Sequence, residues 1–198
     1  GKLICHCSGA MTSNIFSGVT EAGAFGYSIH PMYAISSTTK SYREMQKCFF
    51  TVEGAEEWGN KLCRFIRLLG NDCVLLSTEN KTKYHAAAVF ASNLVNGLYG
   101  SAVSLLEDCG FEEKQAEQAL VPLFMGNASH IAEDGPVAGL TGPIERNDTT
   151  TVKKHLNVLD ANEKHIYISV SGAVLALAEQ KYPNRDYSEM KKILSGQE

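Results

Sequence analysis

Three polar side chains that could take part in chemistry fall on one stretch of helical periodicity, residues 81–106. Lys81 and His85 are one helical turn apart, and Asn93 stands about 80° from His85 around the axis at ~100° per residue. Histidine exchanges protons near neutral pH, and lysine donates hydrogen bonds as an ammonium group. The alternative is structural: a solvated lysine, a packed histidine and an asparagine that bridges helices.

A second set of candidates follows the first two predicted strands. Ser8-Gly9 comes after the first strand, and His30-Pro31 comes after the second. Ligands of open α/β sheets bind beyond the carboxyl ends of the strands, so these four residues are predicted to border a ligand. Ordinary turn chemistry would explain Gly9 and Pro31 as well, but a turn does not require His30.

A third set lies on a Gly- and Pro-rich connection, residues 135–144. The Arg146 guanidinium that follows it could bind a carboxylate or a phosphate through two hydrogen bonds. Thr141 and Gly142 could offer a hydroxyl and a backbone N–H to a ligand, although an ordinary tight turn would use the same residues. Asp148 is expected to cap the next helix.

The first 78 residues read as alternating strands and a helix, which predicts an α/β domain with parallel pairing. Proline cannot continue a ladder, so the second strand is expected to stop at Pro31. The predicted strands are 2–7, 25–30, 48–53 and 73–76, and the predicted helix is 55–69.

After residue 78 the apolar residues recur with helical spacing, so residues 79–198 are predicted to form a second, all-helical domain. Pro122 is expected to interrupt the second helix, and the polar tail from Tyr182 is expected to be partly mobile. The predicted helices are 81–106, 112–124, 127–133, 148–159 and 163–180.

Composition excludes several classes of function. A net charge of −4 over 198 residues gives no basic surface for nucleic acid, and no apolar run reaches the roughly 18 residues of a membrane span. The start lacks the layout of a secretion signal, so a cytoplasmic location is expected. The six cysteines form no Cys-x-x-Cys pair and are expected to be buried free thiols. The Cys5-His6-Cys7 string would suit a metal only with further ligands, so no metal site is predicted.

The opening strand reads as an interior strand without protection of its edge, which predicts that earlier strands of the sheet lie on an upstream segment.

Four segments together resemble one family, the Rossmann-like proteins with a DUF2520 C-terminal domain. These are NAD(P)-dependent oxidoreductases related to pyrroline-5-carboxylate reductase and ketopantoate reductase. The resemblance covers nearly the whole chain. The segments are Cys7-Ser-Gly-Ala10, Ser28-Ile-His-Pro31, Lys81-x-x-Tyr-His-Ala-Ala-Ala-Val-Phe-Ala-Ser-Asn93 and Thr141-Gly-Pro-Ile-x-Arg-x-Asp148.

The resemblance implies the rear part of a Rossmann-like sheet, followed by a helical domain like the C-terminal domain of 6-phosphogluconate dehydrogenase. It implies hydride transfer between NADP or NAD and a small carbonyl or imine substrate. Lys81 or His85 would be the acid/base, and Asn93 would be a positioning amide. The helical domain would form a homodimer. The main nucleotide site would lie upstream, because residues 1–198 contain no G-x-G-x-x-G.

Two other functions remain open. One is a dinucleotide-binding or regulatory protein of the same fold without turnover, and the other is a metal-dependent protein that uses Cys5, His6 and Cys7.

Overall fold

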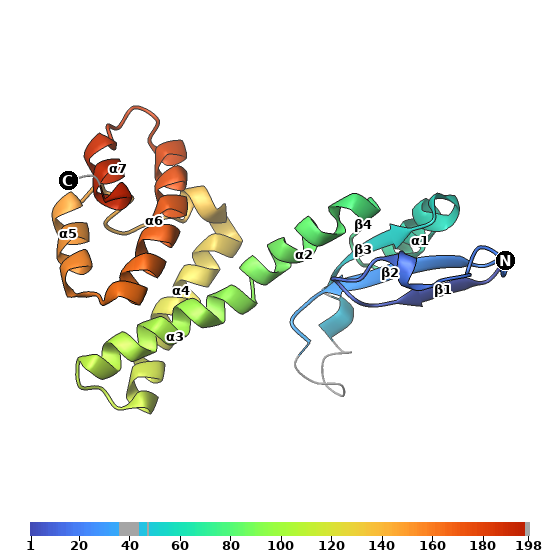
Figure 1. The fold of residues 1–198 in the computed structure, drawn as a ribbon, viewed down its shortest axis with the longest axis horizontal. Helices are drawn as coiled ribbons and strands as arrows, with labels where there is room; N and C mark the ends of the chain where they lie inside the picture. Colours follow the sequence, from blue (N-terminus) through green and yellow to red (C-terminus); the bar gives the residue numbers. More distant parts are fainter. Residues whose placement is uncertain (36–43, 47, 197–198) are drawn as a thin grey trace. The chain divides into compact units, whose positions relative to one another are not determined.

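The protein consists of two compact units, Gly1–Leu98 and Tyr99–Glu198 (Figure 1). The computed structural model describes residues 1–35, 44–46 and 48–196. The predicted fold class, α/β followed by all-α, is confirmed. The division between the units falls inside a helix, later in the chain than residue 78, where the sequence pattern changes.

The first unit contains a four-stranded sheet in the order β1-β2-β3-β4. The parallel pairing expected from sequence is right for β1–β2 and for β3–β4, and it is wrong for β2–β3, which is antiparallel. A parallel pair needs a crossover connection, and helix α1 provides one between β3 and β4. The bounds are β1 Leu3–His6, β2 Phe25–Met32, β3 Phe49–Gly54, α1 Glu56–Leu68 and β4 Cys73–Leu75.

The two central strands, β2 and β3, have faces of opposite chemistry. Successive side chains of a strand point to opposite faces. Tyr27 and Val52 lie in an apolar cluster with Cys63 and Ile66 of α1. The residues that alternate with them are polar: Ser28 pairs with Glu53, and His30 pairs with Thr51. These four form what we call the polar face, and three of them, Ser28, Glu53 and Thr51, are buried.

Strand β2 does not stop at Pro31 as expected, since Pro31 pairs with Phe50 and the strand continues to Met32. Strand β1 pairs only with Phe25 to Ser28, so β2 has a single described neighbour at the proline. Because β1 does not reach Pro31, the missing N–H of this proline removes no hydrogen bond between β2 and β1.

Strand β1 is the edge of the described sheet, and its Leu3 and Ile4 side chains are exposed. The expectation that the cysteines are buried is right for Cys48, Cys63 and Cys73 and wrong for the other three, Cys5, Cys7 and Cys109.

The long helix expected over 81–106 is two helices, α2 Lys81–Phe90 and α3 Asn93–Asp108. The Ser92 hydroxyl donates to the Ala88 carbonyl, and the Ser92 N–H bonds to Val89, three residues back. These bonds tighten the backbone and end the first helix there.

Helix α4, Glu113–Ala138, runs through Pro122, where an interruption was expected. The helical geometry breaks instead at Gly135, whose φ of 80° lies in the left-handed region and which precedes Pro136. The two helices predicted over 112–124 and 127–133 are thus one element.

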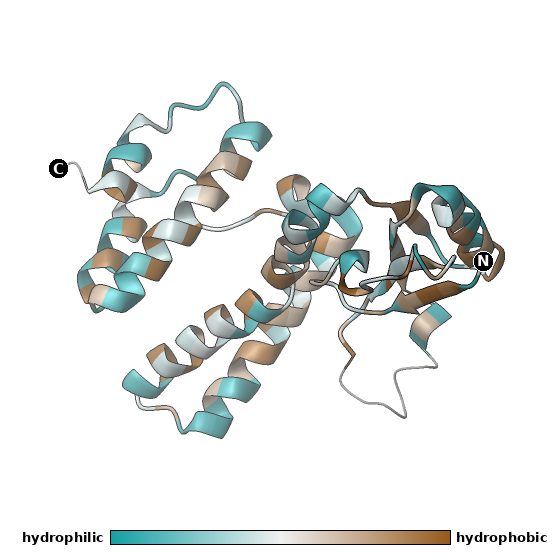
Figure 2. Ribbon diagram, turned by 45° about the vertical axis from the view of Figure 1, so that its right-hand side comes forward, coloured by the Kyte–Doolittle hydropathy of each residue, from teal (hydrophilic) through white to brown (hydrophobic). Residues whose placement is uncertain are grey.

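The core of the second unit is formed by α5 Thr149–Val158, α6 Ala161–Lys181 and α7 Ser188–Ser195. Each of these helices carries both hydrophilic and hydrophobic residues along its length (Figure 2). The tail expected to be mobile contains α7, and Met190 is fully buried in this core. The apolar residues Met190, Ile193 and Leu194 recur at helical spacing and explain the difference.

One stretch of the described residues, Thr78–Asp108, is long and apolar enough by length and composition to cross a membrane. It comprises α2 and α3, which have 10 and 16 residues. Each is shorter than the roughly 20 residues that one spanning helix needs.

Candidate functional site

Five of the residues predicted from sequence gather on the polar face of the first unit: Ser8, Gly9, His30, Lys81 and His85. The first two turns of α2 supply Lys81 and His85, the end of β2 supplies His30, and the turn after β1 supplies Ser8 and Gly9. We call this group the polar cluster. The following contacts hold it together.

Lys81 is the fully buried member of the polar cluster, with none of its surface exposed. Its Nζ donates to the Ser28 hydroxyl at 2.7 Å, and that hydroxyl donates to the Ser8 carbonyl at 2.9 Å. Burial lowers the pKa of the Lys81 ammonium, while the negative charge of Glu53 acts in the opposite direction. Lys81 thus connects the start of α2 to the turn after β1.

Glu53 is a second fully buried ionisable residue on the polar face. Its carboxylate accepts hydrogen bonds from the Ser13 N–H and hydroxyl, both at 2.9 Å, and from the Thr78 hydroxyl at 2.8 Å. The described residues contain no ion pair between Glu53 and Lys81, so the carboxylate acts on the ammonium through the intervening space.

His30 forms a hydrogen-bonded pair with Tyr84 of α2, in which His30 Nδ1 lies 2.6 Å from the Tyr84 hydroxyl. Burial lowers the pKa of His30, with smaller contributions from Lys81 and His85, so its neutral form is favoured. Burial raises the pKa of Tyr84. The nearby Thr51 hydroxyl acts in the opposite direction and lowers the pKa of Tyr84. This hydroxyl is buried and makes no hydrogen bond of normal geometry within the described residues.

Gly9 is the point at which the two imidazoles meet. A β-carbon on Gly9 would lie 2.8 Å from His30 Nε2 and 2.9 Å from His85 Cδ2. Both rings therefore contact the backbone of the turn, and any side chain there would displace them. His85 is partly exposed, and its ring nitrogens make no hydrogen bond within the described residues.

Sequence reasoning missed three residues of this arrangement: Ser28, Glu53 and Tyr84. It assigned no role in the site to Tyr84, which lies in the predicted helix, or to Ser28 and Glu53, which lie in predicted strands. A signal was available, because polar residues alternate with apolar ones along both β2 and β3. Parallel sheets are usually buried on both faces, so that alternation in a sheet predicted to be parallel indicates a polar site.

The other predicted site residues lie elsewhere. Pro31 is buried within β2, and Asn93 begins α3, exposed, with its side chain bonded to the Ser92 hydroxyl. Asn93 follows Lys81 by twelve residues, about 18 Å along a helix.

Thr141, Gly142 and Arg146 belong to the second unit. The φ of Gly142 is 108°, and the Arg146 N–H bonds to the Gly142 carbonyl. The Arg146 side chain is exposed. In the same connection, the Glu145 carbonyl accepts hydrogen bonds from Arg185 Nη1 at 2.6 Å and the Tyr187 hydroxyl at 2.9 Å.

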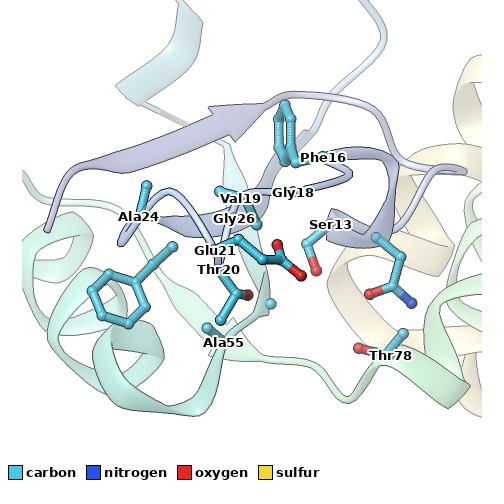
Figure 3. Close-up of a pocket in the computed structure, with 13 residues that line it drawn as sticks. Ser13, Phe16, Gly18, Val19, Thr20, Glu21, Ala24, Gly26, Ala55 and Thr78 are labelled. Atoms are coloured by element: carbon cyan, nitrogen blue, oxygen red, sulfur yellow. The ribbon is translucent and has the colours of Figure 1, made fainter.

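A hollow of about 420 Å³ lies beside the Glu53 hydrogen bonds, since Ser13 and Thr78 form part of its wall. Ser13, Phe16 and Glu21 are among the residues that line this hollow (Figure 3). Its lining contains no basic residue. Within the part of the chain that the structure describes, no group of three or more His, Cys, Asp and Glu side chains could hold a metal.

Comparison with solved structures shows the same fold in two proteins. The protein TM1727 from Thermotoga maritima is 25% identical over 90% of this chain and 70% of its own, with a TM-score of 0.75. The "putative NADP oxidoreductase BF3122" from Bacteroides fragilis is 24% identical over 88% of this chain and 65% of its own, with a TM-score of 0.67. This chain thus spans about two thirds of the length of each.

The chain matches none of the curated proteins. A family model described as "Domain of unknown function (DUF2520)" matches residues 48–174, which include β3, the polar residues of α2 and the connection that carries Arg146. The chain therefore belongs to the DUF2520 family.

Proposed function

We propose that this protein is an NAD(P)-dependent oxidoreductase that transfers hydride between the nicotinamide and a small carbonyl or imine compound. The observation that carries the proposal is the polar cluster, in which two imidazoles lie against one glycine at the carboxyl ends of β1 and β2. This is the edge at which open α/β sheets bind ligands. The name of the Bacteroides fragilis protein supports the same class of reaction and NADP as the cofactor.

In this proposal His85 is the proton donor. Its ring is partly exposed, and its nitrogens make no hydrogen bond to any residue that the structure describes, whereas Lys81, the other candidate, is fully buried and bonded to Ser28. When bound, the nicotinamide supplies the hydride for the substrate carbon. His85 gives a proton to the substrate oxygen or nitrogen and regains one from water.

Ser8, Gly9, His30 and Pro31 are proposed to border the nicotinamide. The backbone at Gly9 carries no side chain, so a flat ring can approach it closely. Residues 1–198 contain no G-x-G-x-x-G, so these groups are assigned to the nicotinamide end of NADP or NAD rather than to its phosphates.

In the second unit, Arg146 is proposed to bind an anionic group of the substrate, with Thr141 and Gly142 as additional donors. Asn93 keeps its proposed role as a positioning amide.

The first experiment measures NADPH and NADH binding to the full-length protein by fluorescence, then oxidation of the bound cofactor by a panel of small carbonyl and imine compounds. His85→Ala is expected to lower turnover by roughly 10²-fold to 10⁴-fold, the usual contribution of a general acid, with cofactor affinity unchanged. The matched control is His165→Ala, because His165 is an exposed histidine of the second unit. Unchanged turnover in His85→Ala would overturn this assignment.

A non-catalytic dinucleotide-binding protein of the same fold is the second candidate. The complete burial of Lys81 favours it, because one of the two acid/base groups expected from sequence cannot touch a substrate in this conformation. Tight NADPH binding without oxidation by any compound of the panel would support this candidate.

We also propose a homodimer in the cytoplasm. Phe90, Leu94 and Leu98 recur at helical spacing along α2 and α3 and expose 71%, 47% and 41% of their surface. A row of exposed apolar side chains on a soluble protein usually marks an interface. Light scattering is expected to give a dimer for the natural protein and a monomer for Leu94→Lys, and a monomeric natural protein would contradict the proposal.

A further inference from the structure

We propose that Lys81 is a positioning residue, whose buried ammonium fixes the Ser8-Gly9 turn beneath His30 and His85 through the Ser28 hydroxyl, with Glu53 as its distant counter-charge. This inference rests on the function proposed above and changes the role that sequence reasoning gave to Lys81.

The direction of the hydrogen bonds supports this role. The Ser28 hydroxyl has one proton, which it donates to the Ser8 carbonyl at 2.9 Å. It must therefore accept from Lys81 Nζ, 2.7 Å away, and that donation is of the kind that a charged ammonium makes strongly. The chain from Lys81 through Ser28 to Ser8 thus has one polarity and ends on the backbone of the turn.

The turn is held on its other side by its own serine. The Ser8 hydroxyl accepts from the Ala10 N–H at 3.3 Å and from the Met11 N–H at 3.1 Å, and the Ser8 N–H donates to His6 Nδ1 at 3.1 Å. The Ser8 carbonyl is the group through which this local network joins the buried face of the sheet. Loss of that bond would remove the hydrogen bond between the turn and the buried face of the sheet.

The position of the turn matters because of Gly9. The His30 and His85 rings pack so closely on Gly9 that they leave no room for a β-carbon. A small movement of the turn would therefore change the place of both imidazoles. Lys81 reaches the proposed chemistry through this contact and not by touching a substrate.

Glu53 supplies a negative charge that acts against the lowering of the Lys81 pKa by burial. Three donated hydrogen bonds hold its carboxylate in place on the same face as Ser28, the residue opposite it in the ladder. A fixed negative charge near a buried ammonium offsets part of the cost of removing that ammonium from water.

The test compares Lys81→Met and Ser28→Ala with Lys83→Met, a matched control that removes an exposed lysine from the same helix. Amide hydrogen exchange of Ala10 and Met11 in the folded full-length protein is measured by NMR. Both test variants are expected to speed this exchange about 5-fold or more, the loss expected for one hydrogen bond between neutral groups, and the control is expected to leave it unchanged. Ser28→Ala keeps the test available if Lys81→Met does not fold. Unchanged exchange in Ser28→Ala would overturn the proposal.

Cofactor measurements separate this inference from the proposed function. As a positioning residue, Lys81 should resemble Ser28 in its effects, so Lys81→Met and Ser28→Ala should weaken NADPH binding and lower turnover by similar factors. A Lys81 that transferred a proton would instead lower turnover far more in Lys81→Met than in Ser28→Ala, which would contradict the positioning role. Absence of NADPH binding in the natural protein would refute the proposed function alone, because the exchange result does not depend on cofactor.

Discussion

The two faces of strands β2 and β3 both contain fully buried residues, but one face packs apolar side chains and the other forms hydrogen bonds. Tyr27 and Val52 on one face, and Ser28 and Glu53 on the other, all have 0% of their surface exposed. The first pair packs with α1 in an apolar cluster, whereas the second pair holds a buried ammonium and receives hydrogen bonds from three segments.

Burial of apolar groups stabilises a fold, while burial of charged groups costs stability unless their partners are well placed. The comparison teaches that the inside of this sheet is one half apolar core and one half polar network, the half to which the proposed function is assigned. Substitutions on the apolar face should therefore change stability alone, whereas substitutions on the polar face should change stability and ligand binding together.

The largest effect is expected from Glu53→Gln on the polar face. It removes the counter-charge of Lys81 and places an amide N–H₂ against donors, so the free energy of unfolding should fall by about 3 kcal/mol. Urea unfolding followed by the fluorescence of Trp58, the single tryptophan, reports this unit specifically. Glu79→Gln, at an exposed position close by, is the control. If Glu53→Gln lowered the free energy of unfolding no more than Glu79→Gln does, the charges of Glu53 and Lys81 would not be coupled.

The second effect is expected from Val52→Ala on the apolar face. Two buried methyl groups are lost and a small cavity remains, which should lower the free energy of unfolding by about 2 kcal/mol. The affinity of the folded protein for NADPH should not change, because Val52 points away from the polar cluster. A loss of NADPH affinity as large as that of Ser28→Ala would remove the distinction between the faces.

The smallest effect concerns pH. The pKa of His30 is lowered in the folded protein from its usual 6.5, so the unfolded state binds more protons as the solution becomes acidic. The stability that depends on neutral His30 is present above pH 6.5 and is lost as the pH falls through the lowered value. As the pH falls below 6.5, the free energy of unfolding of His30→Gln should decrease less steeply than that of the natural protein. The free energy of unfolding of the control His165→Gln should decrease as steeply as that of the natural protein. Parallel slopes for His30→Gln and the natural protein would contradict this.

Sequence reasoning named the five residues of the polar cluster, because their positions follow from local rules of strands and helices. The rule that ligands bind beyond strand ends led to Ser8, Gly9 and His30, and a spacing of one helical turn led to Lys81 and His85. The helix cap at Asp148 was likewise predicted and is confirmed, because the Asp148 carboxylate accepts from the Thr151 N–H.

The remainder depended on tertiary contacts that periodicity does not encode. Tyr84 has the spacing of an apolar stripe, but its hydroxyl meets His30, which is 54 residues earlier in the chain. The complete burial of Lys81 follows from the position of Ser28, and no property of the helix alone indicates it. The antiparallel β2–β3 pair, which brings Ser28 opposite Glu53, also has no local signature.

Helix α7 has a practical consequence for the design of shortened variants. Its Met190 closes the core of the second unit, and the residues before it, Arg185 and Tyr187, bond to the Glu145 carbonyl beside Arg146. Deleting the polar tail from Pro183 would therefore remove the anchor of a connection almost forty residues earlier in sequence. Removal of this tail by a protease would therefore change the position of Arg146, although Arg146 itself would remain in the chain.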